Sequence, residues 1–151
     1  MKKILLVEDD EPKIAQISEL LVSSSPEIHF EVARSLSSAC RKVDDVRYDG
    51  VLLDMSLPTF DGGKTASSSG RQKALGGREM LMYMWELEIE APVFVITQFT
   101  DFIGDEDVID LSDLDLQLRD LFPGLYSGYA YFEHNSDAWK TRVKEFIGKI
   151  S

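Results

Sequence analysis

The stretch VLLDMSLPTFDGGKT, residues 51–65, places an acidic residue directly after a run of apolar residues and ends in Gly-Lys-Thr. Gly-Lys-Thr after a strand can also end a phosphate-binding P-loop, whose first glycine stands five residues before its second. Pro58 occupies that position, has no N–H to donate and fixes the backbone φ. The glycines therefore predict a surface loop, and Asp54, where the apolar run stops, becomes the candidate for chemistry.

The composition restricts the classes of partner. The chain has 151 residues, 44% of them hydrophobic, which is enough for one domain with a sizeable core. A formal charge of -11 argues against nucleic acid and anionic membranes as partners, because phosphate contacts need Lys and Arg. The single cysteine, Cys40, excludes an internal disulfide and fits a reducing compartment. No apolar run approaches the ~20 residues of a membrane span, so a cytoplasmic protein is expected.

Apolar runs alternate with helical patterns along the whole chain. Continuous apolar runs are typical of strands buried on both faces, and apolar residues at helical spacing indicate helices between them. Five such strands predict an α/β fold, a doubly wound parallel sheet with helices on both faces. The strands are expected at residues 3–7, 28–33, 51–54, 92–97 and 128–132, and the helices at 14–21, 36–43, about 78–90 and after the candidate caps Asn135 and Ser136.

Acidic residues follow two of the predicted strands. In parallel sheets, ligands bind outside the carboxyl ends of the strands, where Glu8, Asp9 and Asp10 follow the first strand, Asp54 the third and Thr97 the fourth. Packed carboxylates need a proton or a cation, and oxygen ligands suit Mg²⁺. A carboxylate beside Mg²⁺ can itself attack a phosphoryl group. The alternative is that the first acidic run is only a favourable helix start.

Three stretches together resemble the receiver domain of bacterial two-component response regulators, a family with a flavodoxin-like (β/α)5 fold. They are KILLVEDDEPK at 3–13, YDGVLLDMSLPTFDGG at 48–63 and PVFVIT at 92–97. The resemblance covers the chain as a single domain, 1–151, and implies a signalling phosphoacceptor rather than an enzyme. Its partners would be a sensor histidine kinase or histidine phosphotransfer protein and an unknown output protein, with a homodimer possible.

The resemblance also assigns roles to residues. Asp54 would accept the phosphoryl group from a partner histidine, and Thr97 would be the switch hydroxyl. Glu8, Asp9 and Asp54 would hold Mg²⁺, with the backbone carbonyl of Ser56 completing the metal shell. Asp10 is expected to start the following helix.

The sequence departs from the family pattern at the end of the fifth strand. Receivers usually carry Lys-Pro there, the lysine contacting the phosphoryl group, whereas Phe132 and Glu133 take these positions here. No lysine occurs between Lys73 and Lys140, so the phosphoryl-neutralising cation that receivers usually carry at this strand end is missing. The substitutes expected are His134, or Lys64, Arg71 and Lys73 of an inserted loop that would close over the site.

Other functions stay open on the sequence alone. The missing lysine is the main argument for a pseudo-receiver, a binding module that does not switch by phosphorylation. A phosphatase of the haloacid dehalogenase type would need a second Asp where Ser56 stands.

Two further residues are compared with the family pattern near the switch hydroxyl. Gln98 replaces the small residue that receivers have after the switch hydroxyl, and Tyr129 takes the position of the switch aromatic.

Two segments are longer than in most receivers. The first is an inserted loop over about residues 63–76, and the second is a remodelled fourth-helix region over about 100–127. In the second, apolar residues at helical spacing predict an acidic amphipathic helix from about Ser112 that would face an unusual partner. The chain ends at Ser151, directly after the last receiver helix, so output is expected through protein contact or through a further domain outside this sequence.

Overall fold

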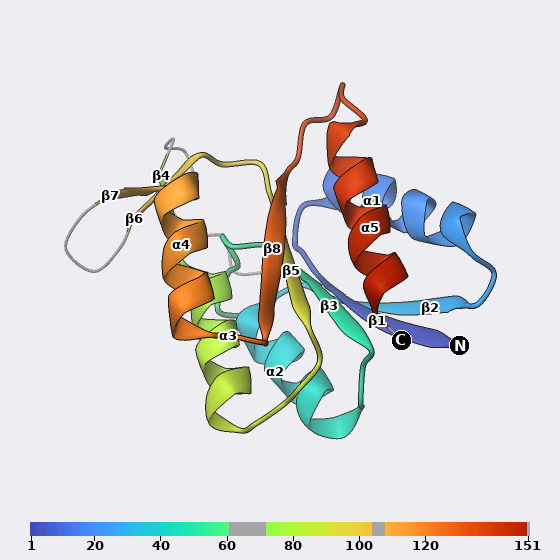
Figure 1. Cartoon of the computed structure of the whole chain (residues 1–151), viewed down its shortest axis with the longest axis horizontal. Coiled ribbons are helices and arrows are strands. Elements are labelled where there is room, and N and C mark those ends of the chain that lie inside the picture. Colours follow the sequence, from blue (N-terminus) through green and yellow to red (C-terminus); the bar gives the residue numbers. More distant parts are fainter. Residues whose placement is uncertain (61–71, 104–107, 151) are drawn as a thin grey trace.

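The computed structural model describes residues 1–60, 72–103 and 108–150. Its main sheet has five parallel strands in the order β2-β1-β3-β5-β8, drawn in Figure 1. This order is that of the flavodoxin-like doubly wound fold, so the predicted fold class is confirmed. The strands are β1 (Lys2–Val7), β2 (Ile28–Ala33), β3 (Gly50–Leu53), β5 (Val93–Thr97) and β8 (Tyr126–Tyr131).

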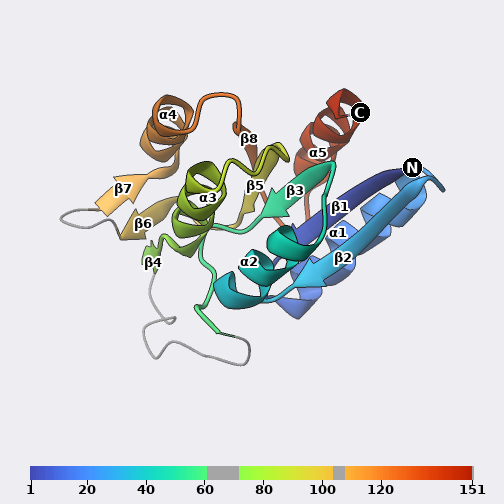
Figure 2. The ribbon, with the colours of Figure 1, turned by 90° about the horizontal axis from the view of Figure 1, so that it is seen from below.

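Helices cover both faces of this sheet, as Figures 1 and 2 show. Successive side chains of a strand point to opposite faces, so the central strands contribute to two separate hydrophobic cores. Leu5 and Val7 of β1, for example, belong to one core, and Ile4 and Leu6 to the other. One face is covered by α1 (Glu11–Ser24) and α5 (Ala138–Lys149), the other by α2 (Leu36–Asp45), α3 (Gly76–Glu86) and α4 (Leu111–Leu121).

The helix starts follow local capping chemistry. The Asp10 side chain caps α1 by accepting a hydrogen bond from the backbone N–H of Lys13, in agreement with its predicted place at a helix start. At α5, the predicted caps Asn135 and Ser136 are one or two residues too early, because Asp137 holds the cap position. The Ser136 hydroxyl still accepts a hydrogen bond from the N–H at the first helical position.

Helix α3 begins earlier than its apolar pattern suggested. It spans Gly76–Glu86, against a prediction of about 78–90, so the two glycines at 76 and 77 are helical rather than part of a loop. A Cβ added to Gly77 would lie 2.7 Å from the backbone oxygen of Asp54 and 2.8 Å from the Cα of Met55. The absence of a side chain therefore lets α3 pack directly on the segment that follows β3.

A second, three-stranded sheet was not predicted. It consists of β4 (Gln72–Ala74), β6 (Asp101–Ile103) and β7 (Val108–Asp110), with β6 parallel to β4 and antiparallel to β7. Strands of three residues are too short for an alternating pattern to be recognised, and they fall in the segments interpreted as an inserted loop and a remodelled region. Figure 2 shows this sheet beside α3 and α4, away from α1 and α5.

The predicted acidic helix is confirmed as α4. It begins at Leu111, one residue before the expected start, with the side chain of Asp110 accepting a hydrogen bond from the backbone N–H of Asp113. Leu111, Leu114 and Leu118 are buried against the same core as α2 and α3. In the described ranges, no helix combines the length and the apolar character that crossing a membrane requires.

Candidate functional site

The acidic residues at the ends of β1 and β3 lie together. The two strands pair in parallel with Val7 opposite Leu53, so Glu8 and Asp54 leave the sheet side by side. Carboxylate oxygens of Glu8, Asp9 and Asp54 all lie within 4.8 Å of one another. Glu8 is 2% exposed and Asp54 5% exposed, whereas Asp9 is exposed to solvent. The predicted convergence of these three carboxylates is therefore present, with an open side at Asp9.

A lysine that the sequence analysis gave no role lies among these carboxylates. Lys13, in the first turn of α1, is 1% exposed. Its Nζ is 2.5 Å from Oε1 of Glu8 and 3.4 Å from Oδ1 of Asp54. It also donates a 2.8 Å hydrogen bond to the backbone carbonyl of Ile96 on β5. The end of the last strand carries Phe132 rather than a lysine, as the sequence indicated, and the pocket instead contains a lysine from α1, a source that the sequence analysis did not consider.

Burial and charge act together on the groups of this pocket. Burial would lower the pKa of Lys13, but the carboxylates of Asp54 and Glu8 outweigh it and raise that pKa above its ordinary value. Burial and the charge of Asp54 raise the pKa of Glu8, and Lys13 offsets only part of this effect. Desolvation followed by the charge of Asp54 raises the pKa of Asp9. One lysine thus neutralises only part of the negative charge, and the pocket retains an attraction for a further cation.

Glu8 is held in place by the start of α1. Its Oε2 accepts hydrogen bonds of 3.2 Å from the backbone N–H groups of Asp9 and Asp10, while Oε1 contacts Lys13. Both carboxylate oxygens of this buried side chain therefore have partners, as burial of a charge requires. The turn between β1 and α1 positions the glutamate and its lysine together.

Thr97 and Ser56, the other predicted site residues, flank the same end of the sheet. Thr97 ends β5 and is fully buried, and its Oγ1 accepts a 3.2 Å hydrogen bond from the backbone N–H of Phe99. Ser56 lies two residues after Asp54, and its buried hydroxyl has no hydrogen-bond partner among the described residues. The switch role of the threonine and the metal-binding role of the Ser56 carbonyl remain predictions.

Of the substitutes predicted for the missing lysine, the structure describes the side chain of His134, which contacts Gln16 and Phe132 rather than Asp54. His134 is exposed, its Nδ1 lies 2.8 Å from Nε2 of Gln16, and its ring packs edge-on against Phe132. Lys64 and Arg71 of the inserted loop lie outside the described residues. Lys73 belongs to the short strand β4.

A signal for Lys13 was present in the sequence. Lys13, Ile17, Leu20 and Leu21 stand at positions i, i+4, i+7 and i+8, which form one face of a helix. A lysine in line with buried apolar residues has to find a partner inside the protein. The pattern marked the lysine as buried, although it could not name the carboxylates that receive it.

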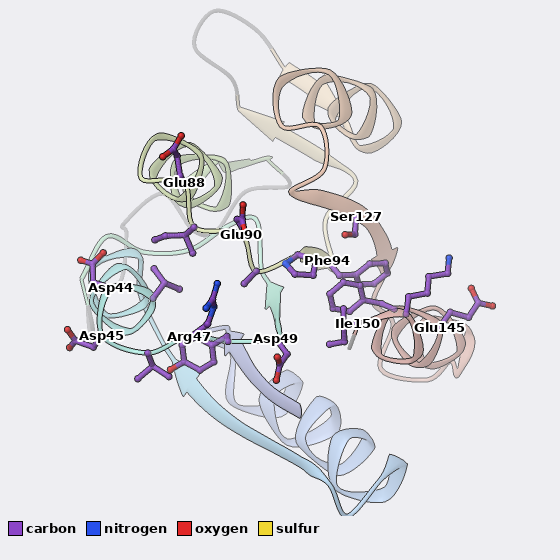
Figure 3. Close-up of a pocket in the computed structure, with 18 of the residues that line it drawn as sticks. Asp44, Asp45, Arg47, Asp49, Glu88, Glu90, Phe94, Ser127, Glu145 and Ile150 are labelled. Atoms are coloured by element: carbon purple, nitrogen blue, oxygen red, sulfur yellow. The ribbon is translucent and has the colours of Figure 1, made fainter. Parts of the chain in front are cut away.

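A wide cleft lies at the opposite end of the sheet. It has a volume of about 1180 Å³ and is lined by Asp49 before β3, Pro92 before β5 and Ser127 in β8, as the close-up in Figure 3 shows for part of this lining. Both acidic and basic side chains line it, among them Glu90, Arg47 and others from the ends of α2 and α5. Because it opens at the amino ends of the strands, it is separate from the acidic pocket at their carboxyl ends.

Known proteins with similar sequences and folds were found. The chain is 30% identical over 142 residues to the uncharacterised protein y4jR of Sinorhizobium fredii, covering 94% of each chain. It is 29% identical over 106 residues, 70% of this chain and 69% of the other, to the Detocs response regulatory protein DtcB of Enterobacter cloacae. No family model matches the sequence.

The fold is similar to solved receiver structures. One is the response regulator TrrA of Thermotoga maritima in complex with Mg²⁺ and BeF, with a TM-score of 0.61 at 21% identity over 96% of this chain and 98% of that chain. By its five-stranded fold and its sequence relationship to a response regulatory protein, the chain is similar to the receiver domains of response regulators.

Proposed function

We propose that Asp54 accepts a phosphoryl group and that this modification changes the contacts of the domain with partner proteins. The observation that carries the proposal is the position of Asp54, 5% exposed at the end of the central strand β3, beside a buried ammonium group and two further carboxylates. A carboxylate in such surroundings is protected from bulk water yet lies beside the exposed Asp9, where a phosphoryl donor can approach. The sequence relationship to a response regulatory protein supports this function.

The donor set fits a magnesium ion. Glu8, Asp9 and Asp54 offer three carboxylates with oxygens within 4.8 Å of one another, and Mg²⁺ prefers a few carboxylate oxygens together with water. We infer that these residues hold the ion, with the backbone carbonyl of Ser56 as a further ligand. When bound, Mg²⁺ would offset the negative charge that gathers on the transferring phosphoryl group.

The transfer uses the chain's own carboxylate as the nucleophile. An oxygen of Asp54 attacks the phosphorus of a phosphohistidine on a sensor kinase or phosphotransfer protein, so an O–P bond forms and the P–N bond breaks. The electron pair of that bond goes to the imidazole nitrogen of the donor, which takes up a proton. A threonine hydroxyl has one proton to donate besides its acceptor capacity, so Thr97 can keep its contact with Phe99 and donate to a phosphoryl oxygen.

The test is the intact mass of the protein after incubation with Mg²⁺ and acetyl phosphate. The wild type should gain one phosphoryl group, and Asp54→Asn should gain none. Asp120→Asn, an exposed carboxylate of α4, is the matched control and should be modified like the wild type. A wild type that stays unmodified with ample donor and metal would refute the phosphoacceptor function and favour a pseudo-receiver.

A further inference from the structure

A lysine from an unexpected element contacts the acceptor carboxylate. Receivers usually place this cation at the end of the last strand, where Phe132 stands here. We propose that Lys13, in the first turn of α1, is the cation that neutralises the phosphoryl group on Asp54, in place of a strand-end lysine. The inference rests on the proposed function, because it assigns a role in phosphoryl transfer to the same site.

The contacts of Lys13 suit this role because they differ in length. The 2.5 Å contact with Glu8 and the 2.8 Å hydrogen bond to the Ile96 carbonyl are short and hold the ammonium in place. The contact with Asp54, at 3.4 Å, is the longest of the three. An ammonium group has three N–H donors, so Lys13 can exchange the longest contact for a phosphoryl oxygen while the other two persist.

Phe132, which stands where receivers usually have the lysine, lies beside Lys13 of α1. Its ring is 1% exposed, packs against Trp139 and lies 5.7 Å from Nζ of Lys13. The residue after β8 thus provides an aromatic ring that contacts the ammonium group, and α1 provides the positive charge. We therefore infer that the two unusual residues belong together: Phe132 replaces the strand-end lysine, and Lys13 on the apolar face of α1 supplies the cation beside it.

The Ile96 contact links the cation to the predicted switch residue. Ile96 directly precedes Thr97, and the backbone carbonyl of Thr97 accepts a hydrogen bond from the N–H of Phe132. Lys13 therefore contacts both Asp54, which directly follows β3, and Ile96 in the neighbouring strand β5. A phosphoryl group that pulls on Lys13 acts on the start of α1, rather than on the loop after β8.

The experiment compares the phosphorylation rate with Mg²⁺ affinity in the full chain. Lys13→Met keeps the length of the side chain without its charge, Lys13→Arg keeps a charge, and Lys144→Met is the control for an exposed lysine. Rates are taken from intact mass with acetyl phosphate, and Mg²⁺ affinity from calorimetric titration without donor. Cooperative thermal unfolding is required of every variant, and Lys13→Gln replaces Lys13→Met if the latter does not unfold cooperatively.

We expect loss of the Lys13 charge to lower the phosphorylation rate and to raise the affinity for Mg²⁺. Lys13→Met should slow phosphorylation about 10- to 100-fold, the effect of losing one charge-assisted hydrogen bond in a buried site. The same variant should bind Mg²⁺ more tightly, on the order of tenfold, because a positive charge beside the metal site is gone. Lys13→Arg should lie closer to the wild type than Lys13→Met, and Lys144→Met should match the wild type.

A double exchange gives the strictest test. In the Lys13→Met background, Phe132→Lys returns a lysine to the strand-end position and should recover part of the lost rate. A Lys13→Met rate within about twofold of the wild type would overturn the proposal. So would a slow rate accompanied by weaker Mg²⁺ binding, which is the result of a merely structural lysine. If the wild type itself is never modified, the proposed function fails first and this role fails with it.

Discussion

The ammonium group of Lys13 donates a 2.8 Å hydrogen bond to the backbone carbonyl of Ile96 and thereby ties the first turn of α1 to the carboxyl end of β5. The two residues are separated by 83 positions in the sequence. Because the same ammonium group contacts Glu8 and Asp54, one side chain joins the ends of three strands. The carboxyl end of the sheet is therefore held together by a charge that comes from a helix.

The first prediction concerns the local stability of α1. In Lys13→Met the tie to Ile96 is lost, and the backbone amides of residues 14–17 should exchange with solvent roughly tenfold faster, since a buried hydrogen bond to a charged group contributes about 1.5–3 kcal/mol. Amide hydrogen exchange followed by mass spectrometry measures this. The amides of β2 serve as an internal control, and equal exchange in α1 of both proteins would contradict the prediction.

The second prediction concerns magnesium. Asp9→Ala should weaken Mg²⁺ binding on the order of tenfold or more, because it removes a charged oxygen ligand from a set of three. Since Asp9 is exposed, the free energy of unfolding should change little. Calorimetric titration measures the affinity, with Asp120→Ala as the control. An unchanged affinity in Asp9→Ala would remove this carboxylate from the metal site.

The third prediction compares two helical glycines. Gly77→Ala should lower the free energy of unfolding by about 1–3 kcal/mol, because its Cβ would meet backbone atoms of Asp54 and Met55. Gly148→Ala, in α5, meets nothing within 4 Å and should raise stability by about 0.5–1 kcal/mol through helix propensity. Urea denaturation measures both. The close packing of α3 on the segment after β3 would be disproved by equal effects of the two substitutions.

The fourth prediction concerns the attachment of α4 to β8. The hydroxyl of the buried Tyr126 donates a 2.6 Å hydrogen bond to Oδ1 of Asp115, and both burial and this bond raise the pKa of the tyrosine. Tyr126→Phe should therefore cost about 1–3 kcal/mol of unfolding free energy, because Oδ1 of Asp115 loses its donor while Oδ2 keeps its contact with Arg119. Tyr131→Phe, at an exposed position of the same strand, is the control. If both variants unfold at the same urea concentration as the wild type, this bond contributes no stability.

The sequence alone determined the main sheet and the position of the acidic cluster. Strands buried on both faces must be continuous apolar runs, so the five strands could be recognised within about two residues of their ends. The carboxyl ends of parallel strands meet at one edge, which is why the order of the residues was enough to place Glu8 and Asp54 together. The position of Asp10 at the start of α1 could also be predicted, because an Asp side chain caps the N-terminus of a helix.

Only the tertiary structure decided which cation enters the pocket. Lys13 and Asp54 are 41 residues apart, and a long lysine side chain can reach in many directions, so local sequence rules do not specify its partner. The prediction looked for a cation in the inserted loop and at His134 near the fifth strand, and therefore missed one from α1. The small sheet of β4, β6 and β7 was hidden for a related reason, since strands of three residues take their shape from their neighbours rather than from a pattern of their own.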